Sequence, residues 1–296
     1  MIDIRQSLEY AQYIKSLGWK VEKLGKWNIF IKKFPLIGSL MKIQRLEPPI
    51  PYEEIEALAK KHRAFQVVIE PSPSSSPSLT PDSLLTSPPH PFYRPLNSPF
   101  IPTKTLILNL NRSEEEIFNS FSKNKRRDLR IAQRNNLKIE EGTTKQFVQL
   151  KKNFLWQKHI IPFAAKREIL PLYQAFGPEK AKILTAFSNT LNSPKALKPL
   201  AGLILLFYNQ TAYYWQAAAS DAGKKLLVPT LLLWEAIKLA KKKGCTVFDF
   251  EGVYDERFPE NKSWLGFTHF KQGFGGKEIL YPEPVTKIKF PFSVII

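Results

Sequence analysis

Apolar and polar positions alternate along the chain with two periods, one typical of helices and one typical of strands. Residues 227–243 carry apolar side chains at helical spacing, end in three lysines and are followed by Gly244, which predicts a helix with a glycine C-cap. Helices are also expected at 5–17, 52–62, 113–121, 122–135, 145–158 and 167–176. Strands are expected at 20–24, 28–34, 40–43, 65–69, 106–110, 181–187, 199–208, 211–219 and 246–250. This order predicts an α/β protein with mixed sheets.

A change of composition divides the chain. Proline and serine dominate residues 71–104, so this stretch is expected to be a loop rather than a core element. Order resumes with a strand at 106–110 and with Ser113 and Glu116, whose spacing predicts a capping box at a helix start. We therefore expect one α/β domain over 1–104 and a second over 105–280. The apolar tail 290–296 is expected to form a terminal strand.

The charge of the chain predicts an anionic partner. A formal net charge of +18 over 296 residues suits RNA, a phosphate-rich substrate or a membrane surface, and charge alone does not choose among them. The most basic segment is 122–135, which includes Arg126, Arg127 and Arg130. Its cationic face is either a phosphate-binding surface or a solvated one.

Cysteine and histidine usage argues against metal chemistry. Cys245 is the single cysteine, and the four histidines are scattered without the spacing of metal ligands, so we expect no metal site. No cofactor motif is found either, because the sequence has no P-loop and no dinucleotide fingerprint. We also expect no signal peptide and no membrane-spanning helix, which favours a cytoplasmic protein.

The stretch 245–276 carries the candidate chemistry. Asp249 stands at the end of a predicted strand, where it is either a proton acceptor that orients an amine or a cap of the following turn. Glu251 is a further candidate in the same loop. Lys271 lies among aromatic residues in sequence, so it either stabilises developing negative charge or packs its stem on Phe267 and Phe274.

One known donor-binding pattern is missing. Acetyl-CoA enzymes of the GNAT type bind pyrophosphate on a turn with the pattern Arg/Gln-x-x-Gly-x-Gly/Ala before a helix. The counterpart here, residues 221–225, lacks that pattern, which disfavours a CoA donor.

Two motifs of this stretch are Phe248-Asp249-Phe250-x-Gly252 and, further on, Phe270-Lys271-x-x-Phe274-Gly275-Gly276. Together they resemble the C-terminal signature of the Fem family. Six further segments are similar to that family in the same order: Tyr10-Ala11-x-x-x-Lys15-Ser16-Leu17-Gly18-Trp19, Val68-Ile69-Glu70-Pro71, Thr105-x-x-Leu108-Asn109-Leu110, Lys125-Arg126-Arg127-x-Leu129-Arg130-x-Ala132, Leu200-Ala201-Gly202 and Trp234-Glu235-Ala236-Ile237-x-x-Ala240-Lys241-x-x-Gly244. The chain departs from the usual family pattern at 44–48 and at 215–218.

The resemblance implies two GNAT-like domains with a cleft between them and without a coiled-coil arm. It implies that the second domain interrupts the first, which residues 281–296 complete. It further implies the transfer of an amino acid from aminoacyl-tRNA to an amine of a peptidoglycan precursor, with Lys271 and Phe270 as functional residues.

The resemblance also suggests partners for the remaining candidates. Lys15, Arg45 and Arg167 are expected to hold the diphosphate of a nucleotide- or lipid-linked muropeptide, which would bring the protein to the inner face of the membrane. Tyr214 is a further candidate substrate contact. Arg126, Arg127 and Arg130 are expected to bind the tRNA backbone. Two other functions stay open: an N-acyltransferase of the same fold with an acyl-CoA donor, and a non-catalytic module that binds RNA or cell-wall precursors.

Overall fold

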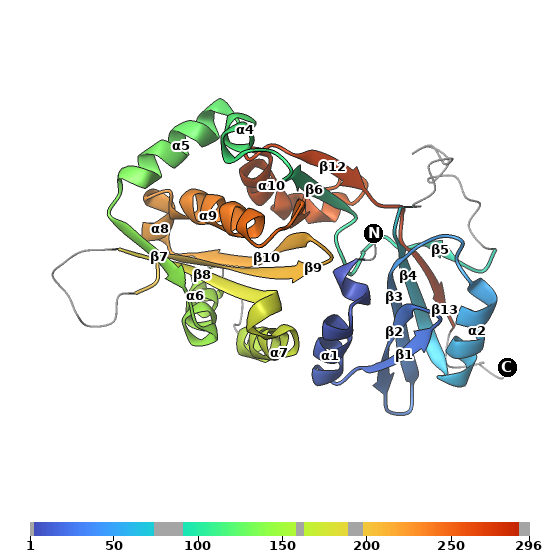
Figure 1. Cartoon of the computed structure of the whole chain (residues 1–296). Helices are drawn as coiled ribbons and strands as arrows, with labels where there is room; N and C mark the ends of the chain where they lie inside the picture. The colour runs from blue at the N-terminus through green and yellow to red at the C-terminus, as the bar shows by residue number, and fades with distance from the viewer. Residues whose placement is uncertain (1–2, 74–90, 158–162, 189–197, 290–296) are drawn as a thin grey trace. The chain divides into compact units, whose positions relative to one another are not determined.

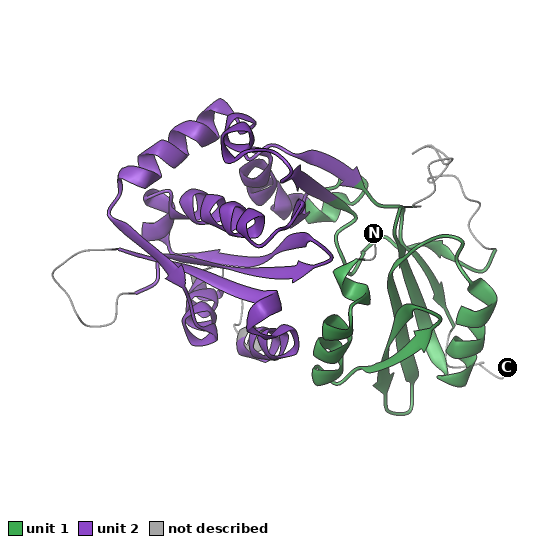
Figure 2. Cartoon of the chain, viewed as in Figure 1, with its two compact units in different colours: residues 1–104, 255–261, 280–296 green, residues 105–254, 262–279 purple. Residues whose placement is uncertain are grey.

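The computed structural model describes residues 3–73, 91–157, 163–188 and 198–289 of the chain (Figure 1). These residues form two compact units, each with its own sheet and helices. Unit 1 comprises residues 1–104, 255–261 and 280–296, and unit 2 comprises 105–254 and 262–279 (Figure 2). The sequence assigned 255–261 to the second domain, whereas the contacts of this segment place it in unit 1.

Unit 1 is built on a six-stranded mixed sheet with the order β1-β2-β3-β4-β13-β5. Its strands are β1 (Lys20–Leu24), β2 (Trp27–Phe34), β3 (Gly38–Leu46), β4 (Ala64–Pro71), β5 (Arg94–Pro95) and β13 (Val285–Ile288). The helical elements are the 3-10 turn η1 (Ile4–Gln6), α1 (Leu8–Ser16) and α2 (Tyr52–Lys61). β3 and β4 are parallel and are joined through α2, and β13, from the end of the chain, pairs antiparallel with β4.

Unit 2 contains a seven-stranded mixed sheet with the order β12-β6-β11-β10-β9-β8-β7. Its strands are β6 (Lys104–Asn109), β7 (Leu137–Glu141), β8 (Ala181–Ser188), β9 (Ala201–Tyr208), β10 (Thr211–Ala219), β11 (Val247–Gly252) and β12 (Lys277–Leu280). The helices are α4 (Glu114–Asn119), α5 (Lys123–Arg134), α6 (Thr144–Gln157), α7 (Phe163–Lys180), α8 (Asp221–Lys225), α9 (Val228–Lys242) and α10 (Leu265–Gln272). The 3-10 turn η2 (Pro259–Trp264) begins in unit 1 and ends just before α10.

Helices cover both faces of the sheet of unit 2. α9 packs on one face and is itself covered by α5, whereas α6 and α7 pack on the other face (Figure 1). α9 crosses from β10 to β11, which are parallel neighbours, just as α2 joins β3 to β4 in unit 1. The protein is therefore a mixed α/β protein, as predicted, and each unit contains antiparallel strands and a parallel pair whose strands are joined through a helix.

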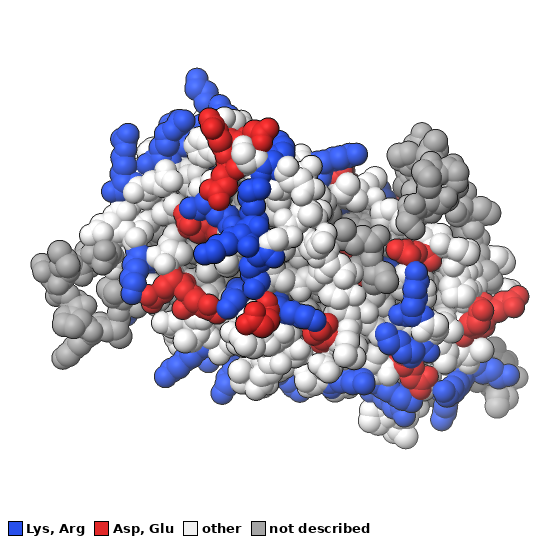
Figure 3. All heavy atoms as spheres, in the orientation of Figure 1, with Lys and Arg blue, Asp and Glu red and all other residues white. Residues whose placement is uncertain are grey.

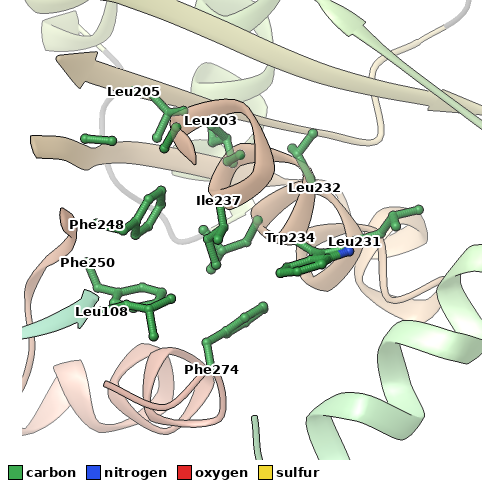
Figure 4. Close-up of a cluster of buried hydrophobic side chains, with 14 of the residues drawn as sticks. Leu108, Leu203, Leu205, Leu231, Leu232, Trp234, Ile237, Phe248, Phe250 and Phe274 are labelled. Atoms are coloured by element: carbon green, nitrogen blue, oxygen red, sulfur yellow. The ribbon is translucent and has the colours of Figure 1, made fainter. Parts of the chain in front are cut away.

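The core of unit 2 is aromatic where α9 meets the sheet. Phe248 and Phe250 of β11 face the buried stripe of α9, and Phe274 closes the cluster (Figure 4). The ring of Phe121 makes edge contacts with Trp234 at 5.4 Å and with Phe274 at 5.1 Å between centroids. Contacts of this kind between large rings fix the helix against the strand ends that carry the site.

Two local predictions are confirmed in detail. The hydroxyl of Ser113 accepts a hydrogen bond from the backbone of Glu116, and the Glu116 carboxylate accepts one from the backbone of Ser113. The helix expected at 227–243 forms as Val228–Lys242, and Gly244 follows with a φ of +78°, which glycine adopts without strain.

One element was not predicted from the sequence, and some predicted segments lie outside the described residues. The sequence did not predict a helix at 264–276, yet α10 forms there and carries Phe270 and Lys271. The tail 290–296 and residues 74–90 of the predicted loop lie outside the described residues. None of the described helices is both long and apolar enough to cross a membrane.

Candidate functional site

The parallel pair at the centre of unit 2 ends in two irregular strands. β10 pairs with β11 from Thr211 opposite Val247 to Tyr213 opposite Asp249. Directly beyond, the register of β10 against β9 shifts after Tyr214, and the register of β11 against β6 shifts after Asp249. Such bulges bend a strand and re-aim its side chains, and they are common beside active sites.

The bulge of β11 is a tight turn held by Asp249. Its Oδ1 accepts hydrogen bonds from the backbone N–H of Glu251, at 2.7 Å, and from the Thr105 hydroxyl. Glu251 has a φ of +58°, and the Thr105 hydroxyl also lies 2.9 Å from its carbonyl oxygen. These are the contacts expected if Asp249 caps the turn, which was one of its two predicted roles. They fix the direction of the next carbonyl group, that of Gly252.

Lys271 points from α10 at that carbonyl group. Its Nζ donates a hydrogen bond of 2.6 Å to the oxygen of Gly252, and the side chain is 8% exposed. The ammonium also lies 4.9 Å from the ring centre of Phe267 and 5.7 Å from that of Tyr214. Burial lowers the pKa of Lys271 to about 8, although the Glu251 and Asp249 carboxylates act to raise it.

Tyr214 and Phe270 connect this lysine to a pocket. The pocket has a volume of about 170 Å³ and lies within unit 2, where the end of β10 meets α9 and α10. Tyr214 and Phe270 both line it, and burial raises the pKa of the Tyr214 hydroxyl. The structure therefore brings five predicted residues together: Tyr214, Asp249, Glu251, Phe270 and Lys271.

A second buried lysine, which the sequence analysis did not single out, lies beside Phe270. The Nζ of Lys125 is 4.2 Å from the ring centre of Phe270 and 4.9 Å from that of Phe274, and burial lowers its pKa. Its hydrogen-bond contact is the Thr230 hydroxyl at 3.5 Å. Helical spacing was the available signal, because Lys125 precedes the buried residues Leu129 and Ala132 by four and seven positions.

The three arginines predicted to bind tRNA differ in their surroundings. Arg126 donates hydrogen bonds to the carbonyl oxygens of Asn119, at 2.6 Å, and Phe121, at 2.9 Å, so it closes the end of α4. Arg127 and Arg130 are exposed on α5, where Arg127 pairs with Asp128 at 3.4 Å. Figure 3 shows Lys and Arg side chains projecting from this part of unit 2.

The three residues predicted to hold a diphosphate are not gathered in one unit. Lys15 is exposed on α1 of unit 1, and Arg167 is exposed on α7 of unit 2. Arg45 is 3% exposed, its guanidinium lies 3.3 Å from the ring centre of Tyr281, and it donates a hydrogen bond of 2.6 Å to Pro102. Arg45 thus has a role within unit 1, and its predicted contact with substrate stays a prediction.

In the described part of the chain, no group of three or more His, Cys, Asp or Glu side chains could hold a metal ion.

Comparison with known proteins agrees with this architecture, that of a two-unit protein with a GNAT-like fold. The crystal structure of FemX matches with a TM-score of 0.75 and 17% identity, over 97% of this chain and 92% of that chain. The C-terminal domain of a proposed lysylphosphatidylglycerol synthetase from Agrobacterium fabrum matches with a TM-score of 0.56 and 12% identity, over 96% and 87%. A tandem GNAT protein from the clavulanic acid biosynthesis pathway matches with a TM-score of 0.50 and 10% identity, over 88% and 82%.

A separate comparison with models of protein families matches part of the chain. Residues 174–282, which include Tyr214, Asp249 and Lys271, match the model of the FemAB family. This part of the chain is thus similar to the FemAB family, as its motifs suggested. No curated protein matches it.

Proposed function

We propose that this protein transfers an amino acid from aminoacyl-tRNA to an amine of a peptidoglycan precursor, and so takes part in forming interpeptide bridges. The observation that carries the proposal is the buried ammonium of Lys271, held by the Gly252 carbonyl within the segment that matches the FemAB family. The match of residues 174–282 to the FemAB family supports an acyltransferase in general. The aminoacyl donor and the muropeptide acceptor are the finer parts of the proposal.

The chemistry needs a cation more than it needs a strong base. The acceptor amine attacks the ester carbonyl, a C–N bond forms, and the bond from the carbonyl carbon to the ribose oxygen breaks. The ribose oxygen gains a proton, and the attacking nitrogen loses one. Negative charge develops on the carbonyl oxygen and then on the ribose oxygen, and a fixed ammonium in a water-poor site stabilises such charge strongly. Alignment of the two substrates supplies much of the remaining acceleration.

Lys271 suits this role through its contacts and its titration. With a pKa of about 8 it is mostly protonated at pH 7, so it both carries charge and can donate a proton. One N–H is held by Gly252, and its other two have no hydrogen-bond partner among the described residues. We assign Asp249 the task of fixing the turn that presents the Gly252 carbonyl, while Phe270 and Tyr214 shield the site from water.

Exposed cations of unit 2 would bind the polyanionic substrates. Arg127 and Arg130 on α5 would contact the tRNA backbone without reading its sequence. Arg167, exposed on α7, would contact the diphosphate of a nucleotide- or lipid-linked muropeptide. A lipid-linked acceptor would place the reaction at the inner face of the membrane.

The same fold supports a second donor, an acyl-CoA, because the tandem GNAT protein matches most of the chain. Its sequence signal is missing, since residues 221–225 form the short helix α8 and lack the Arg/Gln-x-x-Gly-x-Gly/Ala pattern of that turn. Stabilisation against thermal unfolding by CoA but not by charged tRNA would favour this alternative.

The decisive experiment is a transfer assay with purified protein. A mixture of tRNAs charged with radiolabelled amino acids is incubated with UDP-linked and, separately, lipid-linked muropeptide, and the products are analysed by mass spectrometry. We expect one amino acid to appear on the acceptor amine. Absence of labelled product from a folded protein with every donor and both acceptors would overturn the proposal.

A further inference from the structure

Small residues on two paired strands form the floor of the pocket in unit 2. Ala217 and Ala218 of β10 lie opposite Leu203 and Gly202 of β9, just past the bulge of β10. Most of the strand residues that line the pocket are alanine or glycine, so the side chains of the strands fill little of this space. The small residues of these strands therefore leave room for the pocket.

The walls of the pocket are apolar. Leu232 and Pro229 from the first turns of α9 bound it on one side, and Phe154 of α6, Tyr214 and Phe270 complete the enclosure. Among the described residues that line it, Lys224 alone is charged, and its ammonium lies 2.9 Å from the Asp221 carboxylate with 47% of the side chain exposed. No carboxylate among these lining residues could neutralise a cationic ligand.

The pocket is adjacent to the proposed reaction centre. Tyr214 faces the pocket and also lies under the Lys271 ammonium, 5.7 Å from its ring centre, while Phe270 is the chain neighbour of Lys271. In an aminoacyl ester the side chain branches from the carbon next to the carbonyl group. A carbonyl oxygen stabilised by Lys271 therefore brings the side chain against Tyr214, at the wall of the pocket.

We infer that this pocket receives the side chain of the transferred amino acid and selects a small or medium-sized apolar one. The inference rests on the proposed function and adds the class of donor. At about 170 Å³ the pocket is smaller than the roughly 300–1,000 Å³ typical of drug-sized ligands, which suits a side chain rather than a whole cofactor. An apolar pocket discriminates by about 10- to 200-fold per methylene group that fits or fails to fit. A lysine or arginine side chain would bury its charge without a partner, which strongly disfavours it.

The test compares two neighbouring leucines of α9. Leu232 lines the pocket and is 1% exposed, whereas Leu233 is fully buried and does not line it, so Leu232→Ala and Leu233→Ala remove the same atoms from similarly buried positions. Transfer is measured with one tRNA body charged in turn with alanine, valine, leucine, phenylalanine, lysine or glutamate. We expect the wild type to prefer an apolar amino acid over lysine by at least about 10-fold. Leu232→Ala should raise the ratio of phenylalanine to alanine transfer by about 10-fold or more, and Leu233→Ala should leave this ratio unchanged.

A second variant covers the case in which the leucine variants fail to fold. Ala217→Leu fills the pocket from the strand side and should abolish transfer of leucine and phenylalanine while retaining alanine. Preference for lysine or glutamate in the wild type, or equal preference in all variants, would overturn the inference and leave the proposed function standing. Failure of every charged tRNA as donor would overturn the proposed function, and the inference with it.

Discussion

The Lys271 ammonium donates a hydrogen bond of 2.6 Å to the carbonyl oxygen of Gly252. This partner is a neutral backbone group, and the Asp249 and Glu251 carboxylates influence the ammonium only through space. The positive charge is thus held in place without being neutralised by a contact ion pair. A cation of this kind needs no rearrangement when negative charge develops beside it, which is the requirement for electrostatic stabilisation of a transition state.

The first prediction concerns removal of this charge. Lys271→Ala should lower the rate of transfer by about 100- to 1,000-fold, because developing negative charge loses its stabilising donor. The rate is measured in single turnover with saturating charged tRNA and muropeptide, so that weaker binding does not contribute. Lys262→Ala, which removes an exposed lysine of the same region, is the control and should leave the rate unchanged. An equal rate in Lys271→Ala and the wild type would exclude the proposed role.

The second prediction concerns the pH dependence of stability. The pKa of Lys271 is about 8 in the folded protein, against about 10.4 for lysine in an unfolded chain. Below pH 8 both states are protonated, and the folded state bears the full cost of the buried charge. Between pH 8 and about 10.4 the unfolded chain retains a proton that the folded protein has released, so this group makes the folded state more stable as pH rises.

This contribution is measured as a difference between two proteins, because other buried lysines titrate as well. The free energy of unfolding of the wild type minus that of Lys271→Met should rise by on the order of 3 kcal/mol from pH 7 to pH 10.5. Urea unfolding at both pH values gives this quantity. A difference that stays constant or falls with pH would show that the ammonium is solvated.

Local signals in the sequence were enough to predict much of the fold. The capping box of Ser113 and Glu116 involves residues three positions apart, and α9 has a buried stripe that its own periodicity reveals. α10 escaped prediction because Gly266 and Thr268 favour helix weakly, and contacts from elsewhere in unit 2 hold it in place. One such contact is the hydrogen bond from the backbone of Tyr254 to the Thr268 hydroxyl.

The surroundings of the candidate functional side chains also depend on contacts between residues far apart in the sequence, so they could not be predicted from it. The composition of 122–135 predicted a basic helix, yet it could not separate Lys125, which is buried against Phe270, from Arg127, which is exposed. Arg45 was a reasonable phosphate ligand by residue type, but its guanidinium stacks on Tyr281, which is far away along the chain. The motifs in the sequence were enough to identify the region around Lys271. The hydrogen bond from Lys271 to the Gly252 carbonyl group could be identified only in the structure, because every residue has such a backbone group whatever its type.

The third prediction tests the close packing of α8 on the start of β9. A Cβ at Gly223 would lie 2.3 Å from the Leu200 carbonyl oxygen, which Ser220 holds through both its backbone N–H and its hydroxyl. Gly223→Ala should therefore lower the free energy of unfolding by about 1–3 kcal/mol, as overpacking does. Gly266→Ala in α10 is the matched control, because no atom lies within 4 Å of its Cβ position, and it should be neutral or stabilise by up to about 1 kcal/mol. Equal stabilities of the two variants in urea unfolding would contradict this packing.

The last prediction concerns the charged face of α5. Arg127 and Arg130 are exposed there, so contact with tRNA phosphates would release counterions and make binding weaken with salt. Each of Arg127→Ala and Arg130→Ala should reduce the slope of log affinity against log salt concentration by about 1, without changing preference among tRNA sequences. Affinity is measured by fluorescence anisotropy of labelled tRNA over a series of salt concentrations, with Lys60→Ala, an exposed lysine of α2, as control. Unchanged slopes in both arginine variants would mean that this face is simply solvated, which was the alternative interpretation of its charge.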